Sequence, residues 1–172
     1  MKSYATSIPD VLRIFPERHL DIRGSFSELF DKERYASIGI NEDFEKINIS
    51  ISKRHVLRGL HYQEAPHAQA KLVMCLDGNV MDVAVDLRPD SPTYMQHVSE
   101  LLSDTGGIQL FVPKGFAHGF LVLSERATFL YAVAGKYVKE AERTLAWDDP
   151  IHKIKWPIER PILSAKDSVE SL

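Results

Sequence analysis

Polar and apolar residues alternate along many short segments of this chain, as they do in β-strands. Between residues 46 and 52, three isoleucines alternate with Asn48, Ser50 and Ser52. A period of two predicts a half-buried strand whose polar face is able to line a pocket. Similar apolar or alternating runs predict further strands at residues 10–15, 26–30, 72–87, 96–102, 108–112, 120–123 and 128–133.

Turn residues separate these segments. Asp77-Gly78 predicts a tight hairpin turn inside residues 72–87. One short helix is expected at residues 31–38, with Asp31 as its N-cap and Gly39 just past its end. Many short strands with one or two brief helices predict a mainly β sandwich or barrel. Because there is no internal repeat or linker, we expect a single domain spanning residues 1–172.

The composition narrows the class of protein. The chain has 172 residues, of which 44% are hydrophobic and 26% charged, an ordinary globular balance. A net charge of -3 with both signs dispersed gives no electrostatic basis for binding nucleic acid or an anionic membrane. Cys75 is the only cysteine, so no intrachain disulfide is possible, and no apolar run is long enough to span a membrane. We therefore predict a cytoplasmic protein.

Cationic side chains interrupt two runs that otherwise have the pattern of buried strands. Residues 56–71 contain Arg58, His61 and Lys71, and residues 112–120 contain His118. Unpaired cations are costly among apolar residues, so their concentration here predicts a shared polar site. The remaining histidines, His55, His67, His97 and His152, have the pattern of surface or loop residues, and Trp147 and Trp156 that of packing residues.

The spacing of Arg58 and His61 raises a geometric question. They are three positions apart, so a regular strand would direct them to opposite faces. Gly59 lies between them and is a natural site for a β-bulge, which would bring both side chains into one cavity. Without a bulge, one of the two lies outside the site.

A metal site is the first alternative to consider. The motif Pro113-x-Gly115-x-x-His118 is similar to the second motif of the cupin barrels. The first cupin motif normally supplies a His-x-His pair, whereas this chain has His61-Tyr62-Gln63. The loss of one imidazole leaves too few good ligands, and we predict neither a metal nor another cofactor.

Seven motifs that run in one order from about residue 8 to residue 167 resemble the dTDP-4-dehydrorhamnose 3,5-epimerase family. They are Arg23-Gly24-x-Phe26-x-Glu28, Asn48-x-Ser50 leading to Val56-Leu57-Arg58-Gly59-Leu60-His61-Tyr62-Gln63, Lys71-Leu72-Val73, Asp82-Val83-Ala84-Val85-Asp86-Leu87-Arg88, Pro113-x-Gly115-Phe116-Ala117-His118-Gly119-Phe120, Phe129-Leu130-Tyr131 and Leu163-Ser164-Ala165-Lys166-Asp167. The resemblance implies a cupin-like double-stranded β-helix, or jelly roll. It also implies a homodimer that acts without metal on a nucleotide-linked 4-keto-6-deoxyhexose.

The resemblance also implies a role for individual residues. His61 would remove the proton next to the ketone, Asp167 would hold the His61 imidazole, and Tyr131 would return a proton to the opposite face. Lys71 would face the C4 oxygen of the sugar. The implied substrate-binding residues are Arg23, Glu28, Asn48, Arg58, His118, Glu142 and Lys166, with Tyr137 stacking on the base.

These residue types suit the chemistry. A C–H next to a ketone is a weak acid until a fixed donor stabilises the enolate, and one such donor is worth about 3–4 kcal/mol. Histidine titrates near neutral pH, as a base for this step requires. Inversion then needs a proton from the opposite side, which a tyrosine across the pocket supplies.

Three questions stay open in the sequence. Lys46 and Lys136 stand where the family commonly has a glutamine and an aromatic residue, so the carrier base is thymine, cytosine or guanine. Inversion at C3 and C5, or at C3 alone, is equally open. The alternatives to an epimerase are a sugar-binding cupin without chemistry and a metal-dependent cupin enzyme.

Overall fold

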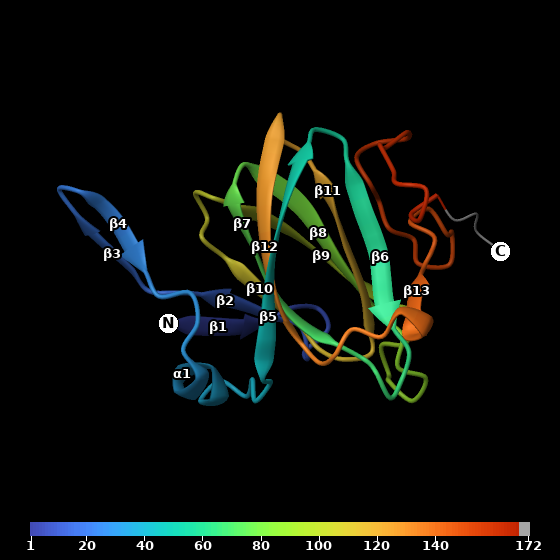
Figure 1. The fold of residues 1–172 in the computed structure, drawn as a ribbon, viewed down its shortest axis with the longest axis horizontal. Coiled ribbons are helices and arrows are strands. Elements are labelled where there is room, and N and C mark those ends of the chain that lie inside the picture. The colour runs from blue at the N-terminus through green and yellow to red at the C-terminus, as the bar shows by residue number, and fades with distance from the viewer. Residues whose placement is uncertain (169–172) are drawn as a thin grey trace.

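The computed structural model describes residues 1–168, which fold mainly into two facing antiparallel sheets (Figure 1). The six-stranded sheet has the order β1 (Lys2–Ala5), β2 (Leu12–Phe15), β10 (Gln109–Val112), β7 (Ala70–Asp77), β12 (Arg126–Ala134), β5 (Phe44–Lys53). The five-stranded sheet has the order β13 (Glu142–Thr144), β6 (Leu57–Gln63), β11 (Phe116–Val122), β8 (Asn79–Asp86), β9 (His97–Ser103). The predicted mainly β, cupin-like fold is confirmed.

The remaining elements are short. Strands β3 (Arg18–Asp21) and β4 (Gly24–Ser27) pair with each other, and η1 (Lys139–Ala141) is a single 3-10 turn. The predicted helix is present as α1 (Lys32–Ala36). As expected, the Asp31 side chain caps it by accepting a hydrogen bond from the Arg34 backbone N–H at 2.8 Å.

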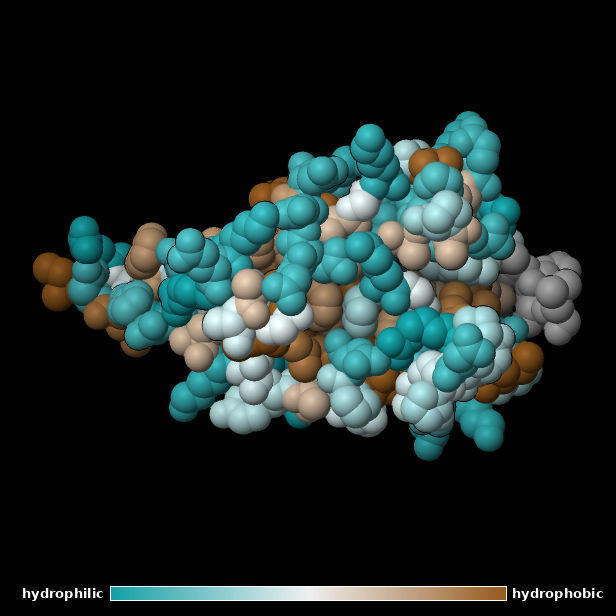
Figure 2. Space-filling model, turned by 90° about the horizontal axis from the view of Figure 1, so that it is seen from below, coloured by the Kyte–Doolittle hydropathy of each residue, from teal (hydrophilic) through white to brown (hydrophobic). Residues whose placement is uncertain are grey.

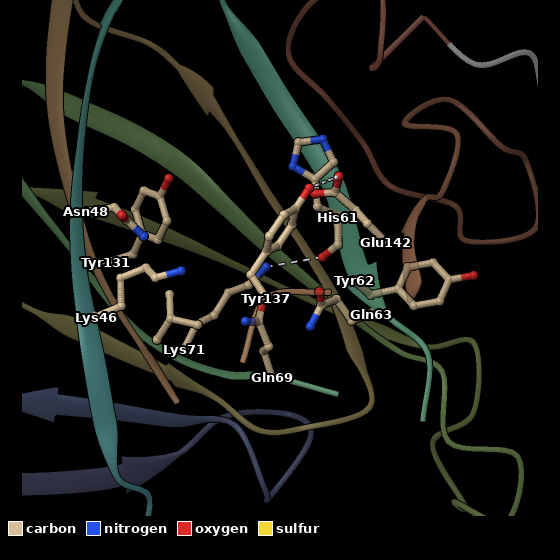
Figure 3. Close-up of a pocket in the computed structure, with 11 residues that line it drawn as sticks. Lys46, Asn48, His61, Tyr62, Gln63, Gln69, Lys71, Tyr131, Tyr137 and Glu142 are labelled. Carbon is tan, nitrogen blue, oxygen red and sulfur yellow. Dashed lines mark hydrogen bonds between the residues drawn. The ribbon is translucent and has the colours of Figure 1, made fainter. Parts of the chain in front are cut away.

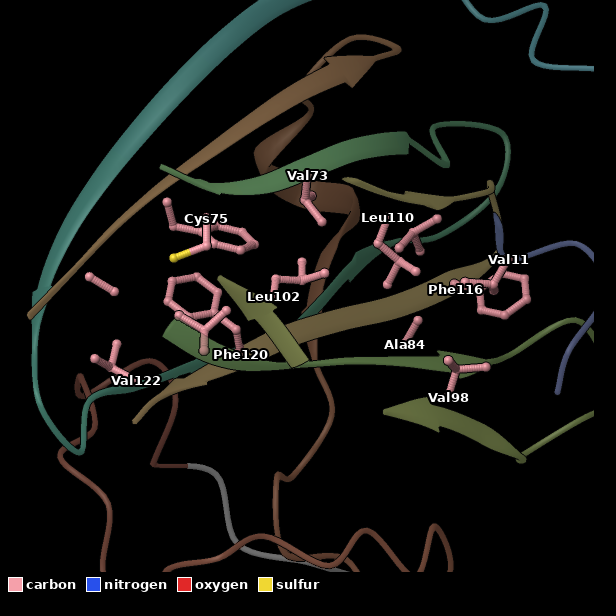
Figure 4. Close-up of a cluster of buried hydrophobic side chains, with 14 of the residues drawn as sticks. Val11, Val73, Cys75, Ala84, Val98, Leu102, Leu110, Phe116, Phe120 and Val122 are labelled. Atoms are coloured by element: carbon pink, nitrogen blue, oxygen red, sulfur yellow. The ribbon is translucent and has the colours of Figure 1, made fainter. Parts of the chain in front are cut away.

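The main hydrophobic core lies between the two sheets, where the inward positions of the alternating strands meet (Figure 4). Val73 and Cys75 on β7 are fully buried in it with Val80 on β8. The rings of Phe120 and Phe129, which belong to opposite sheets, stack with centroids 4.2 Å apart. This packing joins the two layers, because each sheet buries its apolar face against the other.

The chain after β13 covers the outer face of the five-stranded sheet. Val83 and Val85 on β8 are buried there against partners that include Ile154 and Trp156. The expected packing role of Trp156 is confirmed. His152, predicted as a surface or loop residue, does lie in a turn, but its side chain is only 2% exposed. Sequence reasoning missed this because the covering segment has no regular secondary structure.

The predicted hairpin at Asp77-Gly78 was also wrong. The turn is present, with Gly78 at φ +80°, but β7 pairs with β10 and β12 while β8 pairs with β11 and β9. The chain therefore crosses from one sheet to the other at this point. The dipeptide specifies a tight reversal, but the burial of both strands decides which neighbours they pair with.

The β3–β4 hairpin projects from the barrel as an arm, here meaning residues 18–27 (Figure 1). Leu20, Ile22 and Phe26 of the arm are exposed, and apolar surface gathers at its tip (Figure 2). The outer face of edge strand β5 is apolar as well, since its isoleucines at 47, 49 and 51 are more than half exposed. The polar face of β5 points inward, as predicted.

Among residues 1–168, no helix is long and apolar enough to cross a membrane.

Candidate active site

Two adjoining cavities open between the sheets and share three lining residues, His61, Lys71 and Tyr131. One has a volume of about 200 Å³ and is also lined by Lys46, Asn48, Tyr62, Gln63, Gln69, Val133, Tyr137 and Glu142 (Figure 3). The other has a volume of about 140 Å³ and is also lined by Ser50, Arg58, His118, Gly119, Phe120 and Phe129. The two cavities thus meet at the residues expected to do the chemistry.

A β-bulge at Gly59 brings Arg58 and His61 to the same cavity. Strand β6 has three steps between these residues, whereas its partner β11 has two between His118 and Phe120. Gly59 has φ +117°, and a Cβ there would lie 2.6 Å from the Cα of Gly119. The bulge that the sequence suggested is therefore present, and Arg58 and His61 both line the smaller cavity.

His61 forms a dyad with Asp167. The His61 Nε2 lies 2.5 Å from Asp167 Oδ1, and Ser164 Oγ donates to Asp167 Oδ2 at 2.8 Å. Burial alone would raise the pKa of Asp167, but these hydrogen bonds outweigh it and hold the pKa below its usual value. Because a carboxylate only accepts, Nε2 carries the proton. The Nδ1 of His61 is then the basic nitrogen.

Lys71 places a cation beside this dyad. Its Nζ donates to the His61 carbonyl oxygen at 3.2 Å (Figure 3). Burial lowers the pKa of Lys71 to about 8, against the opposing effect of the Asp82 carboxylate. At neutral pH the Lys71 side chain is thus mostly in its charged form, and its ammonium group is partly desolvated. Such a group stabilises a negative oxygen that forms in the cavity.

Tyr131 lies on the opposite wall. It belongs to β12 of the six-stranded sheet, whereas His61 belongs to β6 of the five-stranded sheet (Figure 3). Its ring packs against the core, with its centroid 6.4 Å from that of Phe129. A flat substrate between the sheets therefore has an imidazole on one side and a phenol on the other.

One end of the larger cavity carries an aromatic ring among charges. Tyr137 donates from its hydroxyl to Glu142 Oε2 at 3.0 Å, and Lys166 Nζ lies 2.5 Å from Glu142 Oε1. Burial would raise the pKa of Glu142, but its bonds to Lys166 and Tyr137 outweigh this and lower it. Lys46 Nζ lies 5.9 Å from the centre of the Tyr137 ring. This end suits a stacked ring joined to an anionic group.

The structure brings most of the predicted site residues together. Those that line the cavities or contact a lining residue are Asn48, Arg58, His61, Lys71, His118, Tyr131, Tyr137, Glu142, Lys166 and Asp167. Arg23 and Glu28 lie elsewhere in this chain. Arg23 pairs with Asp21 on the arm, and Glu28 accepts from Arg34 at 2.9 Å. Their proposed contact with substrate stays a prediction.

Sequence reasoning did not find several supporting residues. Asp82 entered the sequence analysis only as part of a family motif, and its side chain is fully buried beside His118. Ser52 Oγ accepts a hydrogen bond from Arg58 Nε at 3.0 Å. The alternation along β5 placed Ser52 on the polar face of the strand, which is the signal that pointed to such a contact. Ser164 belongs to the last of the seven motifs, but its role was not predicted: a local turn brings its hydroxyl to Asp167, three positions further on. Within the described part of the chain, no group of three or more His, Cys, Asp or Glu side chains is arranged to hold a metal ion.

The chain is similar to known proteins over nearly its whole length. A family model described as dTDP-4-dehydrorhamnose 3,5-epimerase matches residues 5–172. The chain belongs to this family. A dTDP-4-dehydrorhamnose 3,5-epimerase from Pseudomonas aeruginosa is 47% identical over 169 residues, which are 97% of this chain and 93% of the relative.

Solved structures of family members have the same fold. A dTDP-6-deoxy-D-glucose-3,5-epimerase from Legionella pneumophila, in complex with dTDP-4-keto-L-rhamnose, is 43% identical with a TM-score of 0.95, covering 99% of this chain and 92% of that one. A 3'-monoepimerase from Streptomyces bikiniensis, in complex with dTDP-quinovose, is 32% identical with a TM-score of 0.88, covering 95% of this chain and 84% of that one. The family thus includes enzymes that invert different numbers of centres.

Proposed function

We propose that this epimerase inverts C3, C5 or both in a nucleotide-linked 4-keto-6-deoxyhexose. The observation that carries the proposal is the placement of the His61–Asp167 dyad and Tyr131 on opposite walls of cavities that also contain Lys71. The alternatives, a sugar-binding cupin without chemistry and a metal-dependent cupin enzyme, give no reason for a base and an acid to face each other.

The reaction begins when His61 Nδ1 takes the proton from the carbon next to the ketone. The C–H electrons form the enolate, and its charge develops on the C4 oxygen, where the Lys71 ammonium stabilises it. Asp167 favours the imidazolium that results, because its carboxylate already accepts the Nε2 hydrogen at 2.5 Å. Tyr131 then gives its proton to the other face of the same carbon, which inverts the centre. Tyr131 regains a proton from solvent, and the His61 imidazolium releases its proton to solvent.

The nucleotide is proposed to occupy the end marked by Tyr137. A base stacks on this exposed ring, and the diphosphate meets cations that include Arg58 and Lys166. We propose dTDP as the carrier, because the Legionella and Streptomyces relatives are described in complexes with dTDP-sugars. Lys46, which lies over Tyr137, is the residue most able to alter this preference.

We further propose a homodimer. The exposed isoleucines of β5 and the exposed apolar residues of the arm form surfaces that a second copy would bury. In this arrangement the arm of one subunit reaches the site of its partner. Arg23 and Glu28, which are separate from their own cavity, would then contact substrate in the other subunit. The cytoplasmic location stays a prediction.

Exchange with solvent tests the proposed chemistry. The enzyme is incubated in deuterated water with dTDP-, CDP- and GDP-linked 4-keto-6-deoxyhexoses, and proton NMR follows the loss of each C–H signal. We expect deuterium at C3, C5 or both, and no incorporation by His61→Ala. His97→Ala is a matched control, since His97 lines neither cavity.

Two outcomes would contradict the proposal. Tight binding of the sugar with no exchange identifies a binding protein instead. Activity that disappears with a chelator and returns with iron or manganese identifies a metal-dependent cupin enzyme.

A further inference from the structure

Asp82 is a carboxylate inside the hydrophobic core. It lies on the inward face of β8 between Val80 and Ala84, both of which belong to the main core cluster, and its side chain is fully buried. A buried charge is costly unless other groups bond to it or balance it. A buried carboxylate next to a catalytic cavity calls for a functional explanation.

The hydrogen bonds of Asp82 lead to the cavity. His118 Nε2 lies 3.0 Å from Oδ1 and 2.9 Å from Oδ2, and over residues 1–168 no other side chain or backbone group bonds to this carboxylate. His118 is itself buried, and it lines the smaller cavity together with Arg58 and Lys71. Asp82 therefore lies behind the basic side chains that line the smaller cavity, and it is bonded to one of them.

The charges around this wall make Asp82 the main counter-charge. Burial lowers the pKa of Lys71 to about 8; Asp82 and Glu142 oppose this, and Lys166 adds to it. Of the two carboxylates, Asp82 has the larger effect. Burial also lowers the pKa of His118, where Asp82 again opposes and Lys71 and His61 add to the shift.

We propose that Asp82 is a positioning residue of the active site. Its carboxylate fixes the His118 ring with the proton on Nε2, and it keeps the Lys71 ammonium charged beside the sugar ketone. The catalytic consequence rests on the proposed epimerase reaction, in which Lys71 stabilises the enolate. The effect on the protonation of Lys71 and His118 does not, because it is a property of the free protein.

The Asp82→Asn variant tests the proposal without substrate. Lysine labelled with carbon-13 at Cε reports each ammonium by NMR, and Lys71 titrates near pH 8, apart from ordinary lysines near 10.5. Loss of a nearby opposite charge lowers the pKa of Lys71 by about one pH unit. Glu100→Gln is the matched control: Glu100 is the Cα partner of Asp82 on β9 but lines neither cavity, so the Lys71 titration stays unchanged.

The same shift gives the activity a pH signature. At pH 8 the charged fraction of Lys71 falls from about one half to about one tenth, so kcat of Asp82→Asn is about fivefold lower from this cause. At pH 6 both proteins keep Lys71 charged, and the ratio returns to within about twofold. A purely structural defect would lower kcat at both pH values.

An unchanged Lys71 titration in folded Asp82→Asn overturns the proposal. Should that variant not fold, nitrogen-15 NMR of histidine in the wild-type protein decides the question: we expect the His118 proton on Nε2 from pH 6 to pH 9. A His118 ring protonated on Nδ1 alone would refute the positioning role. Because neither NMR experiment uses a sugar, failure here is distinct from failure of the proposed epimerase activity.

Discussion

Gly59 offers a quantitative test of how the bulge in β6 builds the site. Two separate features oppose a side chain here: φ is +117°, and an added Cβ would lie 2.6 Å from the Gly119 Cα and 2.8 Å from the His118 carbonyl oxygen. Both contacts are with backbone, so no side chain is able to turn away from them. Gly59→Ala must therefore distort the bulge or push β11 away from β6.

Each feature has its own magnitude. A left-handed backbone conformation costs a residue with a Cβ about 1–2 kcal/mol. Overpacking in a closely packed region costs about 1–3 kcal/mol. Together they predict that Gly59→Ala lowers the free energy of unfolding by about 2–5 kcal/mol. For a chain of this size that corresponds to a fall in Tm of about 4–20 °C.

Two other glycines separate the contributions. Gly39 has φ +90°, but nothing lies within 4 Å of the place that a Cβ would take, so Gly39→Ala carries only the backbone cost of about 1–2 kcal/mol. Gly119 is the converse case: its φ lies outside the left-handed region, but its Cβ would lie 2.5 Å from the Arg58 carbonyl oxygen. Gly119→Ala thus carries only the steric cost of about 1–3 kcal/mol.

Urea unfolding of the three variants, followed by circular dichroism, measures these terms, and kcat/KM measures their effect on the site. We expect Gly59→Ala to be the least stable of the three. It should also lose activity where it is fully folded, because Arg58 and His61 no longer line the same cavity. Gly39→Ala should keep wild-type kcat/KM. Equal losses of stability in Gly59→Ala and Gly39→Ala would show that the close approach of Gly59 to β11 adds nothing to the loss in the free energy of unfolding.

Three further predictions follow from the same structure. In Tyr131→Phe, His61 should still exchange the substrate proton with deuterated water but return it to the same face of the carbon. NMR should therefore show exchange, with epimerisation reduced by about 10²-fold or more. Equal losses of exchange and epimerisation would contradict separate roles for base and acid. The wild-type kcat should fall as the pH rises past the Lys71 pKa of about 8, because the ammonium loses its proton. The expected loss is about fivefold between pH 8 and pH 9. A kcat that is constant to pH 9.5 would exclude Lys71 as the oxyanion donor. Ile49→Glu places a charge on the exposed apolar face of β5 and should convert the proposed dimer to a monomer in analytical ultracentrifugation. Leu101→Glu, at an equally exposed position on β9, should leave the dimer intact. A dimer that survives Ile49→Glu would place the interface elsewhere.

The sequence determined the local features of this protein. The alternation along β5 correctly directed Asn48 and Ser50 into the cavity, and Asp31 correctly marked the start of α1. The position of Gly59 between Arg58 and His61 correctly suggested a bulge. These features depend on neighbouring residues along the chain, and side-chain direction and backbone conformation follow from them directly.

Only the tertiary structure decided what meets across the fold. Asp77-Gly78 predicted a hairpin, but the two strands joined different sheets, because each buries its apolar side chains against the opposite layer. The partner of His61, Asp167, is 106 positions away, and only the family resemblance, not a local pattern, had paired the two. The contact of Asp82 with His118 was found only in the structure. Contacts between distant segments depend on how whole sheets pack, and no local pattern of residues contains that information.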